Sequence, residues 1–215
     1  SKNCPPSFEL TKNNQCKLVS RYQLYRSVQG KGVGGTQTEL PPANDGYSPA
    51  QIDLGRYLFF DPLLSADNSQ SCASCHQPDH GFADITPLSR GVHNKSTTRN
   101  SPSLWNVIFL KRFLWDARET SLEGQVLGPL FSPREMATSP EQVLQKLNSN
   151  THYPKMFVQA FPDSDGEITL QQLATAIAAF ESSLISLNSR YDQYAHGHHE
   201  ALNANAVSYT HLRAH

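Results

Sequence analysis

Residues 72–76 read Cys72-Ala73-Ser74-Cys75-His76, and this stretch decides what the rest of the chain must fold around. In a Cys-x-x-Cys-His motif the two thiols bind the vinyl groups of haem c covalently, and the imidazole that follows binds the iron. Half of a zinc site or a redox dithiol is the alternative, but a zinc site needs a second Cys or His pair, and none is evident nearby. The motif therefore predicts haem c held by Cys72, Cys75 and His76.

Signals for helix starts lie on both sides of this motif. Ser48, Ser139 and Thr169 each precede residues typical of a capped helix N-terminus. Residues 77–103 are interrupted by Pro and Gly and show no persistent hydrophobic period, which predicts a long ordered loop of the kind that wraps a cofactor. No stretch alternates apolar and polar residues for long, so strands have little support. The expected architecture is mainly helical with long loops.

Composition excludes several classes of partner. The 215 residues carry 18 Lys+Arg against 19 Asp+Glu, a net charge of -1, so no basic field would hold nucleic acid or acidic lipid. No run approaches the roughly 18 apolar residues of a membrane span. The hydrophobic content of 38% is low for a packed enzyme, and a large prosthetic group would supply the missing apolar core. The chain begins at Ser1 without a charged and apolar leader, so we expect a removed signal peptide or a fragment.

The N-terminal segment, residues 1–46, contains the other two cysteines. Cys4 and Cys16 frame a polar turn, which fits a small disulfide loop in an oxidising compartment, whereas two free thiols are the alternative. The run Gly30-Lys31-Gly32-Val33-Gly34-Gly35 predicts a flexible, glycine-rich loop. Haem c attachment independently predicts a compartment outside the cytoplasm, and we expect the periplasm.

Characteristic sequence segments also lie on both sides of the haem motif, over about residues 50 to 205. They read LGRYLFFDP (54–62), RNSPSLWN (99–106), FLWDAR (113–118), LEGQ (122–125), GPL (128–130), EM (135–136), AAFE (178–181) and SRYDQY (189–194). Together with the haem motif, these segments make the chain resemble the bacterial di-haem cytochrome c peroxidase and MauG superfamily.

The resemblance implies an all-α fold, namely a cytochrome c-like helical domain with long haem-wrapping loops. Members of the family have two such domains, each with one haem c. The N-terminal haem reduces hydrogen peroxide, and the C-terminal haem collects electrons from a small cytochrome c or a cupredoxin. This chain has only the first motif, so residues 47–188 are expected to form the peroxidatic haem domain, and a second haem is expected in the full-length protein.

The residues after that domain are of two kinds. Residues 189–206 are expected to begin the connection to the second haem domain. Residues 207–215 read VSYTHLRAH, which a common transposase sequencing adapter encodes in frame, so we expect an artificial tail. The alternative is a genuine C-terminus of a mono-haem protein.

The resemblance also assigns roles to three residues near the haem. Glu135 matches the distal acid-base residue, which takes a proton from the inner peroxide oxygen and delivers it to the outer one. Gln125 matches a polar residue that helps to orient the oxygen ligand. Trp115 matches a tryptophan between the two haems that relays electrons. The alternatives are an ordinary surface acid at Glu135 and a core aromatic at Trp115.

Further assignments concern the iron's sixth position and the boundary between the domains. Asn100 matches a residue of a calcium site between the domains, and Arg99 is expected to anchor a haem propionate or the interface. Peroxidases that rest in an inactive bis-His form carry a distal His directly after the loop glycine, whereas here Gly91 is followed by Val92. His93, one position later, is the candidate for a distal iron ligand, and a solvated loop histidine is the alternative. If His93 does not bind, the haem would be open without reductive activation, as in MauG-type members.

Three functions follow, in order of preference. The first is a periplasmic c-type haem peroxidase that reduces hydrogen peroxide to water, a homodimer when full length. The second is a MauG-like di-haem oxidase that modifies a partner protein. The third, from another class, is a mono-haem electron-transfer cytochrome c in which Met136 or Met156 is the axial ligand.

Overall fold

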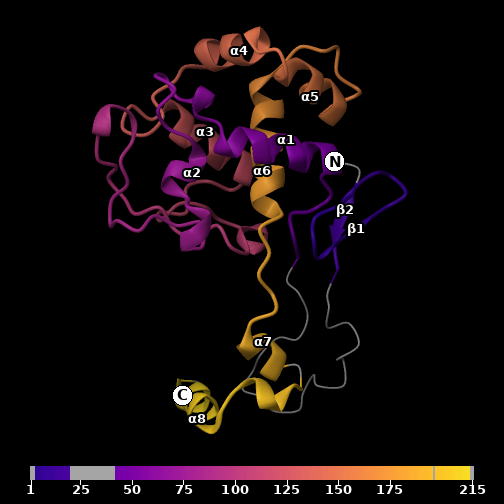
Figure 1. Cartoon of the computed structure of the whole chain (residues 1–215), viewed down its shortest axis with the longest axis vertical. Coiled ribbons are helices and arrows are strands. Elements are labelled where there is room, and N and C mark those ends of the chain that lie inside the picture. Colours follow the sequence, from indigo (N-terminus) through magenta and orange to yellow (C-terminus); the bar gives the residue numbers. More distant parts are fainter. Residues whose placement is uncertain (1–2, 20–41, 196, 214–215) are drawn as a thin grey trace.

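The computed structural model describes residues 3–19, 42–195 and 197–213 (Figure 1). Its α-helices are α1 (Pro49–Phe60), α2 (Cys72–Cys75), α3 (Leu122–Phe131), α4 (Pro140–Ser149), α5 (Tyr153–Ala160), α6 (Leu170–Ser182), α7 (Arg190–Ala195) and α8 (Ala204–Arg213). Short 3-10 turns lie at η2 (Pro62–Leu64), η3 (Pro78–His80), η4 (Val92–Asn94), η5 (Val107–Phe109) and η6 (His199–Ala201). The helical fold class is therefore confirmed. The glycine-rich loop predicted at residues 30–35 lies outside the described residues.

The three predicted helix starts are confirmed, and the same capping chemistry produces each of them. The side chains of Ser48, Ser139 and Thr169 accept hydrogen bonds from the backbone N–H three residues later. At Ser48 and Thr169 the side chain of the glutamine three residues later also accepts a hydrogen bond from the backbone N–H of the cap residue, which completes a capping box. These bonds satisfy amide groups that the first helical turn leaves without a partner.

The core forms where α1 crosses α6, near the middle of the upper part of the molecule in Figure 1. Leu58 and Phe59 on α1 and Leu173 and Ile177 on α6 are fully buried there. Gly55 allows the close crossing, because a Cβ atom at this position would overlap the carbonyl oxygen of Ala176. Each fully buried apolar side chain contributes about 1.5–3 kcal/mol to folding, so this crossing holds the domain together.

A long stretch with little regular structure runs from the end of α2 to the start of α3. It contains only 3-10 turns and isolated bridges, such as those that pair Gln77 with Ala83 and Arg90 with Ser96. The loop predicted over residues 77–103 is therefore confirmed, and it continues as far as Ser121. Figure 1 shows this loop spread beside α2 and α3, away from α4 and α5.

The N-terminal segment corrects the expectation that strands have little support. Strands β1 (Phe8–Leu10) and β2 (Cys16–Leu18) form an antiparallel hairpin. Each strand has three residues, too few for an alternation of apolar and polar side chains to be visible in the sequence. The turn between them is closed by Asn14, whose φ of 57° is in the left-handed region that Asn tolerates.

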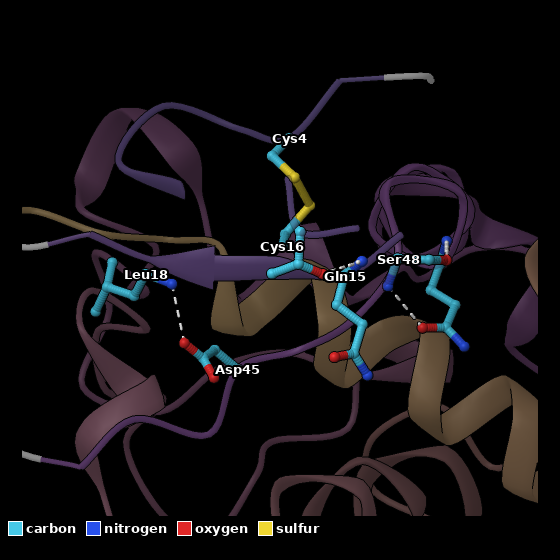
Figure 2. Close-up of a disulfide and its surroundings, with 8 residues drawn as sticks. Cys4, Gln15, Cys16, Leu18, Asp45 and Ser48 are labelled. Atoms are coloured by element: carbon cyan, nitrogen blue, oxygen red, sulfur yellow. Dashed lines mark hydrogen bonds between the residues drawn. A yellow bond between two sulfur atoms is a disulfide. The ribbon is translucent and has the colours of Figure 1, made fainter. Parts of the chain in front are cut away.

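The predicted disulfide between Cys4 and Cys16 is present and joins the chain ahead of the hairpin to β2 (Figure 2). The hairpin is tied to the residues ahead of α1, because the Cys16 N–H donates to the carbonyl of Tyr47 at 2.8 Å. The Leu18 N–H donates to Asp45 at 2.9 Å, as Figure 2 shows. The segment is therefore docked on the helical domain at its α1 end.

Beyond α6 the chain runs in extended form to α7 and α8, at the opposite end of the molecule from α4 in Figure 1. Asn106 holds the start of this run with paired hydrogen bonds to the backbone of Ser186, at 2.8 and 2.9 Å. The proposed domain boundaries at 46, 188 and 206 stay predictions. Within the described ranges, no helix is both long enough and apolar enough to span a bilayer.

Candidate functional site

The haem motif forms a single helical turn, α2, that presents both cysteines. The backbone N–H of His76 donates to the carbonyl of Cys72 at 2.9 Å and closes the turn. Residues three apart lie on one side of a helix, so Cys72 and Cys75 face the same way. Both are free thiols. The turn therefore offers two thiols and the following imidazole from one short segment.

The imidazole of His76 is fixed by two backbone carbonyls. Its Nδ1 lies 2.9 Å from the carbonyl oxygen of Phe82 and 3.1 Å from that of Pro102. A carbonyl oxygen only accepts hydrogen bonds, so Nδ1 carries the proton and the lone pair is on Nε2. Burial lowers the pKa of His76, which favours the neutral ring that a metal requires. The His76 ring is therefore held in one orientation, with the proton on Nδ1 and the lone pair of Nε2 available to a metal.

The two carbonyls were not predicted, because backbone acceptors have no signature in the sequence. Phe82 is in the left-handed region with a φ of 56°, directly after Gly81 with a φ of 67°. Its ring is buried against Phe59 and Trp105, which keeps the strained turn in place. This local conformation turns the Phe82 carbonyl towards the His76 ring.

The chemistry of the donor set fits covalent haem better than zinc. A structural zinc site would need further Cys or His ligands beside Cys72, Cys75 and His76. Over the described parts of the chain, no three His, Cys, Asp or Glu side chains gather in a way that would hold a metal ion. A haem bonded through two thioethers needs only one imidazole from this segment.

Glu135 lies on a tight turn after α3. Its backbone N–H donates to the carbonyl of Ser132 at 3.0 Å, and the next residue, Met136, donates to that of Pro129 at 3.1 Å. The half-buried carboxylate makes no hydrogen bond or ion pair with any other described residue. Burial lowers the pKa of His76, and the charge of Glu135 offsets part of that lowering. The structure therefore brings the predicted acid-base residue close to the predicted iron ligand.

The loop that contains Gly91 packs directly on this turn. The Val92 N–H donates to the carbonyl of Glu135 at 2.8 Å, and the Val92 side chain is fully buried. A Cβ atom at Gly91 would overlap the carbonyl oxygen of Arg134 and lie 2.7 Å from Cα of Glu135. The small residue before Val92 is therefore required by the backbone contact that positions Glu135.

His93 lies at the surface. Its side chain is 66% exposed, and Nδ1 is 3.7 Å from a carboxylate oxygen of Asp67. Its backbone is in the left-handed region with a φ of 54°. This placement gives His93 an acidic neighbour at the surface and supports the solvated-loop alternative, while its predicted binding to iron stays a prediction.

Lys146 on α4 organises the loop that leads into the haem motif. Its Nζ donates to three carbonyls, those of Leu63, Ser65 and Ala66, at 3.2, 2.6 and 3.2 Å, and to Oδ1 of Asn68 at 2.8 Å. The Ala66 N–H in turn donates to the carbonyl of Met136 at 2.9 Å. One ammonium group therefore connects the segment ahead of α2 with the turn that carries Glu135.

Trp115 is 68% exposed, so the core-aromatic alternative is wrong. Its Nε1 donates to the carbonyl of Asn100 at 3.2 Å, and Arg99 pairs with Asp116 at 3.0 Å. These residues line a hollow of about 460 Å³ together with Leu88 and Thr98. The structure brings Trp115, Arg99 and Asn100 together at one surface, and their relay, anchoring and calcium roles stay predictions.

The side chain of Asn100 is oriented by the loop itself. Its amide nitrogen lies 3.3 Å from the carbonyls of both Thr86 and Pro87, to which it donates. This leaves the side-chain oxygen as the group that a calcium ion would take.

Gln125 and the two methionines complete the predicted set. Gln125 is half-buried on α3, and its side-chain amide has no hydrogen-bond partner among the described residues. Met136 is buried in the main hydrophobic core, and Met156 packs against it. Both thioethers therefore pack in the core of this structure, and their binding to iron stays a prediction.

A family model described as di-haem cytochrome c peroxidase matches residues 49–200. The cytochrome c551 peroxidase of Pseudomonas aeruginosa is 38% identical over 157 residues, which cover 73% of this chain and 45% of that protein. The methylamine utilization protein MauG of Methylorubrum extorquens is 35% identical over 166 residues, 77% of this chain and 46% of that protein. The chain thus spans about half the length of these curated relatives.

Solved structures agree with this likeness. The crystal structure of a MauG-like protein associated with microbial copper homeostasis has a TM-score of 0.70 and 31% identity, covering 76% of this chain and 50% of that one. The di-haem peroxidase BthA from Burkholderia thailandensis has a TM-score of 0.62 and 30% identity, covering 69% and 42%.

Proposed function

Because the chain belongs to the di-haem cytochrome c peroxidase family, we propose that residues 47–188 form a c-type haem domain that reduces hydrogen peroxide to water. Cys72 and Cys75 would hold the haem covalently, and His76, whose Nδ1 carries the proton, would bind its iron. The haem, when bound, supplies the electrons that break the O–O bond. The observation that carries the proposal is the unpaired carboxylate of Glu135, whose charge acts on a His76 ring that two carbonyls have oriented.

The reaction consumes two electrons and two protons for each peroxide and gives two water molecules. Glu135 takes the proton from the inner oxygen and gives it to the outer oxygen as the bond breaks. Gln125, whose amide has no protein partner in the described structure, orients the oxygen ligand. The contact of Val92 with the Glu135 carbonyl keeps the carboxylate in place during this transfer.

Electrons reach this domain from outside it. We place their path at the exposed Trp115, since this ring lies on the surface that also carries Arg99 and Asn100. A second haem domain in the full-length protein would cover this surface and take electrons from a small cytochrome c or a cupredoxin. Calcium would bind at the boundary through the Asn100 side-chain oxygen and ligands from the other domain. Haem c and the disulfide between Cys4 and Cys16 both support a periplasmic location.

A MauG-like oxidation of a partner protein is the second candidate, and one observation favours it. The position after Gly91 is a fully buried valine, and His93 beside it is exposed and near Asp67. Without a histidine beside it, a haem bound here would accept peroxide or oxygen without prior reductive activation.

The haem-loaded chain, treated with hydrogen peroxide and a chemical reductant, tests the proposal. We expect peroxide consumption that falls about 100- to 10,000-fold in Glu135→Gln, with the haem content unchanged. A Glu141→Gln variant, which removes an exposed acid on α4, is the matched control and should keep the wild-type rate. Equal rates in wild type and Glu135→Gln would favour the electron-carrier alternative instead.

A further inference from the structure

Glu181, near the end of α6, is a buried carboxyl group that the proposed reaction does not use. It is 5% exposed, and its Oε2 has no hydrogen-bond partner among the described residues. No lysine, arginine or histidine of the described chain forms an ion pair with it. An ionised carboxylate without a partner is too costly to bury, so a neutral, protonated Glu181 is favoured.

A second carboxyl group lies beside it and strengthens this preference. Glu123 on α3 accepts a hydrogen bond of 2.7 Å from the hydroxyl of Tyr47, so its side chain has a partner that the Oε2 of Glu181 lacks. Two neighbouring carboxylates cannot both ionise cheaply, and the one without a partner keeps its proton. Burial, followed by the charge of Glu123, raises the pKa of Glu181 to about 8.

The groups that face Glu181 from the packed elements are few. The groups close enough to interact with its charge are Glu123 on α3, Tyr47 ahead of α1 and Cys72 on α2. The charged residues Asp53 and Arg56 of α1 pair with each other, at 2.8 Å, on its solvent side. No cation therefore opposes a negative charge at Glu181 within the described part of the protein.

Glu181 also lies within electrostatic reach of the haem attachment. Its charge acts on Cys72 and contributes to the raised pKa of that thiol. Cys72 packs against the same core cluster that contains Phe180, the residue before Glu181. A change of charge on a haem bonded to Cys72 would therefore change the pKa of Glu181, because the surrounding core is apolar and screens charges poorly.

We propose that Glu181 binds a proton when the haem on Cys72 and Cys75 gains an electron, and releases it when the haem is oxidised. The inference rests on the haem attachment proposed above. A one-electron reductant removes one positive charge at the iron, and the carboxylate takes one proton from solvent, so that the net charge of the site is unchanged. Loss of that electron, one of the two that each peroxide requires, would release the proton from Glu181 close to a reaction that consumes protons.

The test is the haem midpoint potential of the holoprotein, measured from pH 5 to pH 10. In the wild type, we expect the potential to fall as pH rises between the Glu181 pKa of the oxidised protein and the higher pKa of the reduced protein, approaching one proton per electron. Glu181→Gln should abolish the fall in that region, while Glu167→Gln, an exposed acid ahead of α6, should behave as wild type. An unchanged pH dependence in Glu181→Gln would overturn the proposal.

Two further readouts keep the test decisive. Glu123→Gln removes the neighbouring charge, so the fall in potential should move to lower pH; no movement would count against the proposal, and the result is available even if Glu181→Gln does not fold. Infrared difference spectra between the reduced and oxidised wild type should show a protonated carboxyl band that Glu181→Gln lacks. A wild-type chain that carries no haem would instead contradict the proposed function, which distinguishes the two failures.

Discussion

Among the glycines that the structure describes, Gly55 and Gly91 lie where two backbones come into contact, and the two contacts serve different ends. Gly55 lets α1 cross α6 in the apolar core, where a Cβ atom would overlap the Ala176 carbonyl. Gly91 lets a loop rest on the turn of Glu135, where a Cβ atom would overlap the Arg134 carbonyl. The first contact lies among several fully buried side chains of two helices, whereas the second has the single fully buried side chain of Val92 and the hydrogen bond from its N–H to the Glu135 carbonyl. We therefore assign stability to the helix crossing and reactivity to the loop contact.

The largest effect on stability is expected from Gly55→Ala. The overlap is with backbone, which cannot rotate away, so the unfolding free energy should fall by about 3 kcal/mol. Chemical denaturation measures this loss of unfolding free energy. Gly128→Ala is the matched control, because nothing lies within 4 Å of that Cβ position on α3, and it should be neutral or stabilising by about 0.5–1 kcal/mol. Equal losses in both variants would remove the helix crossing as the cause.

The same substitution at Gly91 should act on the reaction instead. Pushing the loop from the Glu135 turn displaces the carboxylate, and a shift of about 1 Å lowers rates by about 100-fold. The peroxide rate per bound haem is the measurement, compared with the denaturation midpoint. A variant that loses stability as much as Gly55→Ala, at full activity, would contradict the division between the two contacts.

The pH dependence of stability distinguishes Glu181 in the core from the acids around the site. Its pKa is raised from 4.5 to about 8 in the folded protein, so the folded state binds the extra proton between these values. Glu181 therefore contributes stability that is complete below pH 4.5 and lost as pH rises to about 8, by up to about 1.4 kcal/mol per pH unit. Denaturation at pH 5 to 9 should show this loss in wild type and a smaller one in Glu181→Gln. Parallel curves would show that Glu181 titrates normally.

A smaller effect is expected where the helical core meets the site. Lys146→Met removes the donor shared by the carbonyls of Leu63, Ser65 and Ala66, and should cost about 1–2 kcal/mol because the group is only partly buried and Ala66 keeps its bond from Gln142. Lys155→Met, an exposed lysine on α5, is the control. Hydrogen exchange of peptides over residues 62–70 and 132–138 should increase in the first variant only. Exchange confined to 62–70 would show that the two segments are not coupled through Ala66.

The smallest effect is expected at His93. An exposed pair at 3.7 Å contributes less than about 1 kcal/mol, so His93→Ala should leave stability nearly unchanged. The ferric haem spectrum should also be unchanged if the histidine stays at the surface. A change from six-coordinate to five-coordinate iron would show that His93 binds the iron after all.

The sequence predicts the helices that begin with strong local signals. Ser48, Ser139 and Thr169 cap their helices because the capping bond involves residues only three apart. Helix α3 contains Gly124, Gly128 and Pro129, which weaken helix propensity, and α5 has only eight residues. Tertiary packing rather than local preference forms these two, so they are absent from the predicted set.

The candidate site likewise contains residues that the sequence predicts and residues that it does not. Cys72, Cys75 and His76 are predictable because one short motif contains all the side chains that are proposed to attach the haem. The acceptors of the His76 proton are carbonyls of Phe82 and Pro102, and any residue could supply them. Glu135 is predictable only through resemblance, since its proximity to His76 depends on a turn that closes 59 residues later (135 − 76). The parts of the site that depend on long-range contacts between backbones therefore cannot be predicted from the sequence.

The most direct test of the central claim is the intact mass and haemochrome spectrum of the chain produced with a cytochrome c maturation system. We expect the mass of one haem added covalently in the wild type, and none in the double variant Cys72→Ala, Cys75→Ala. A folded wild-type chain without covalent haem, or one that binds stoichiometric zinc through these cysteines, would contradict the assignment of this domain.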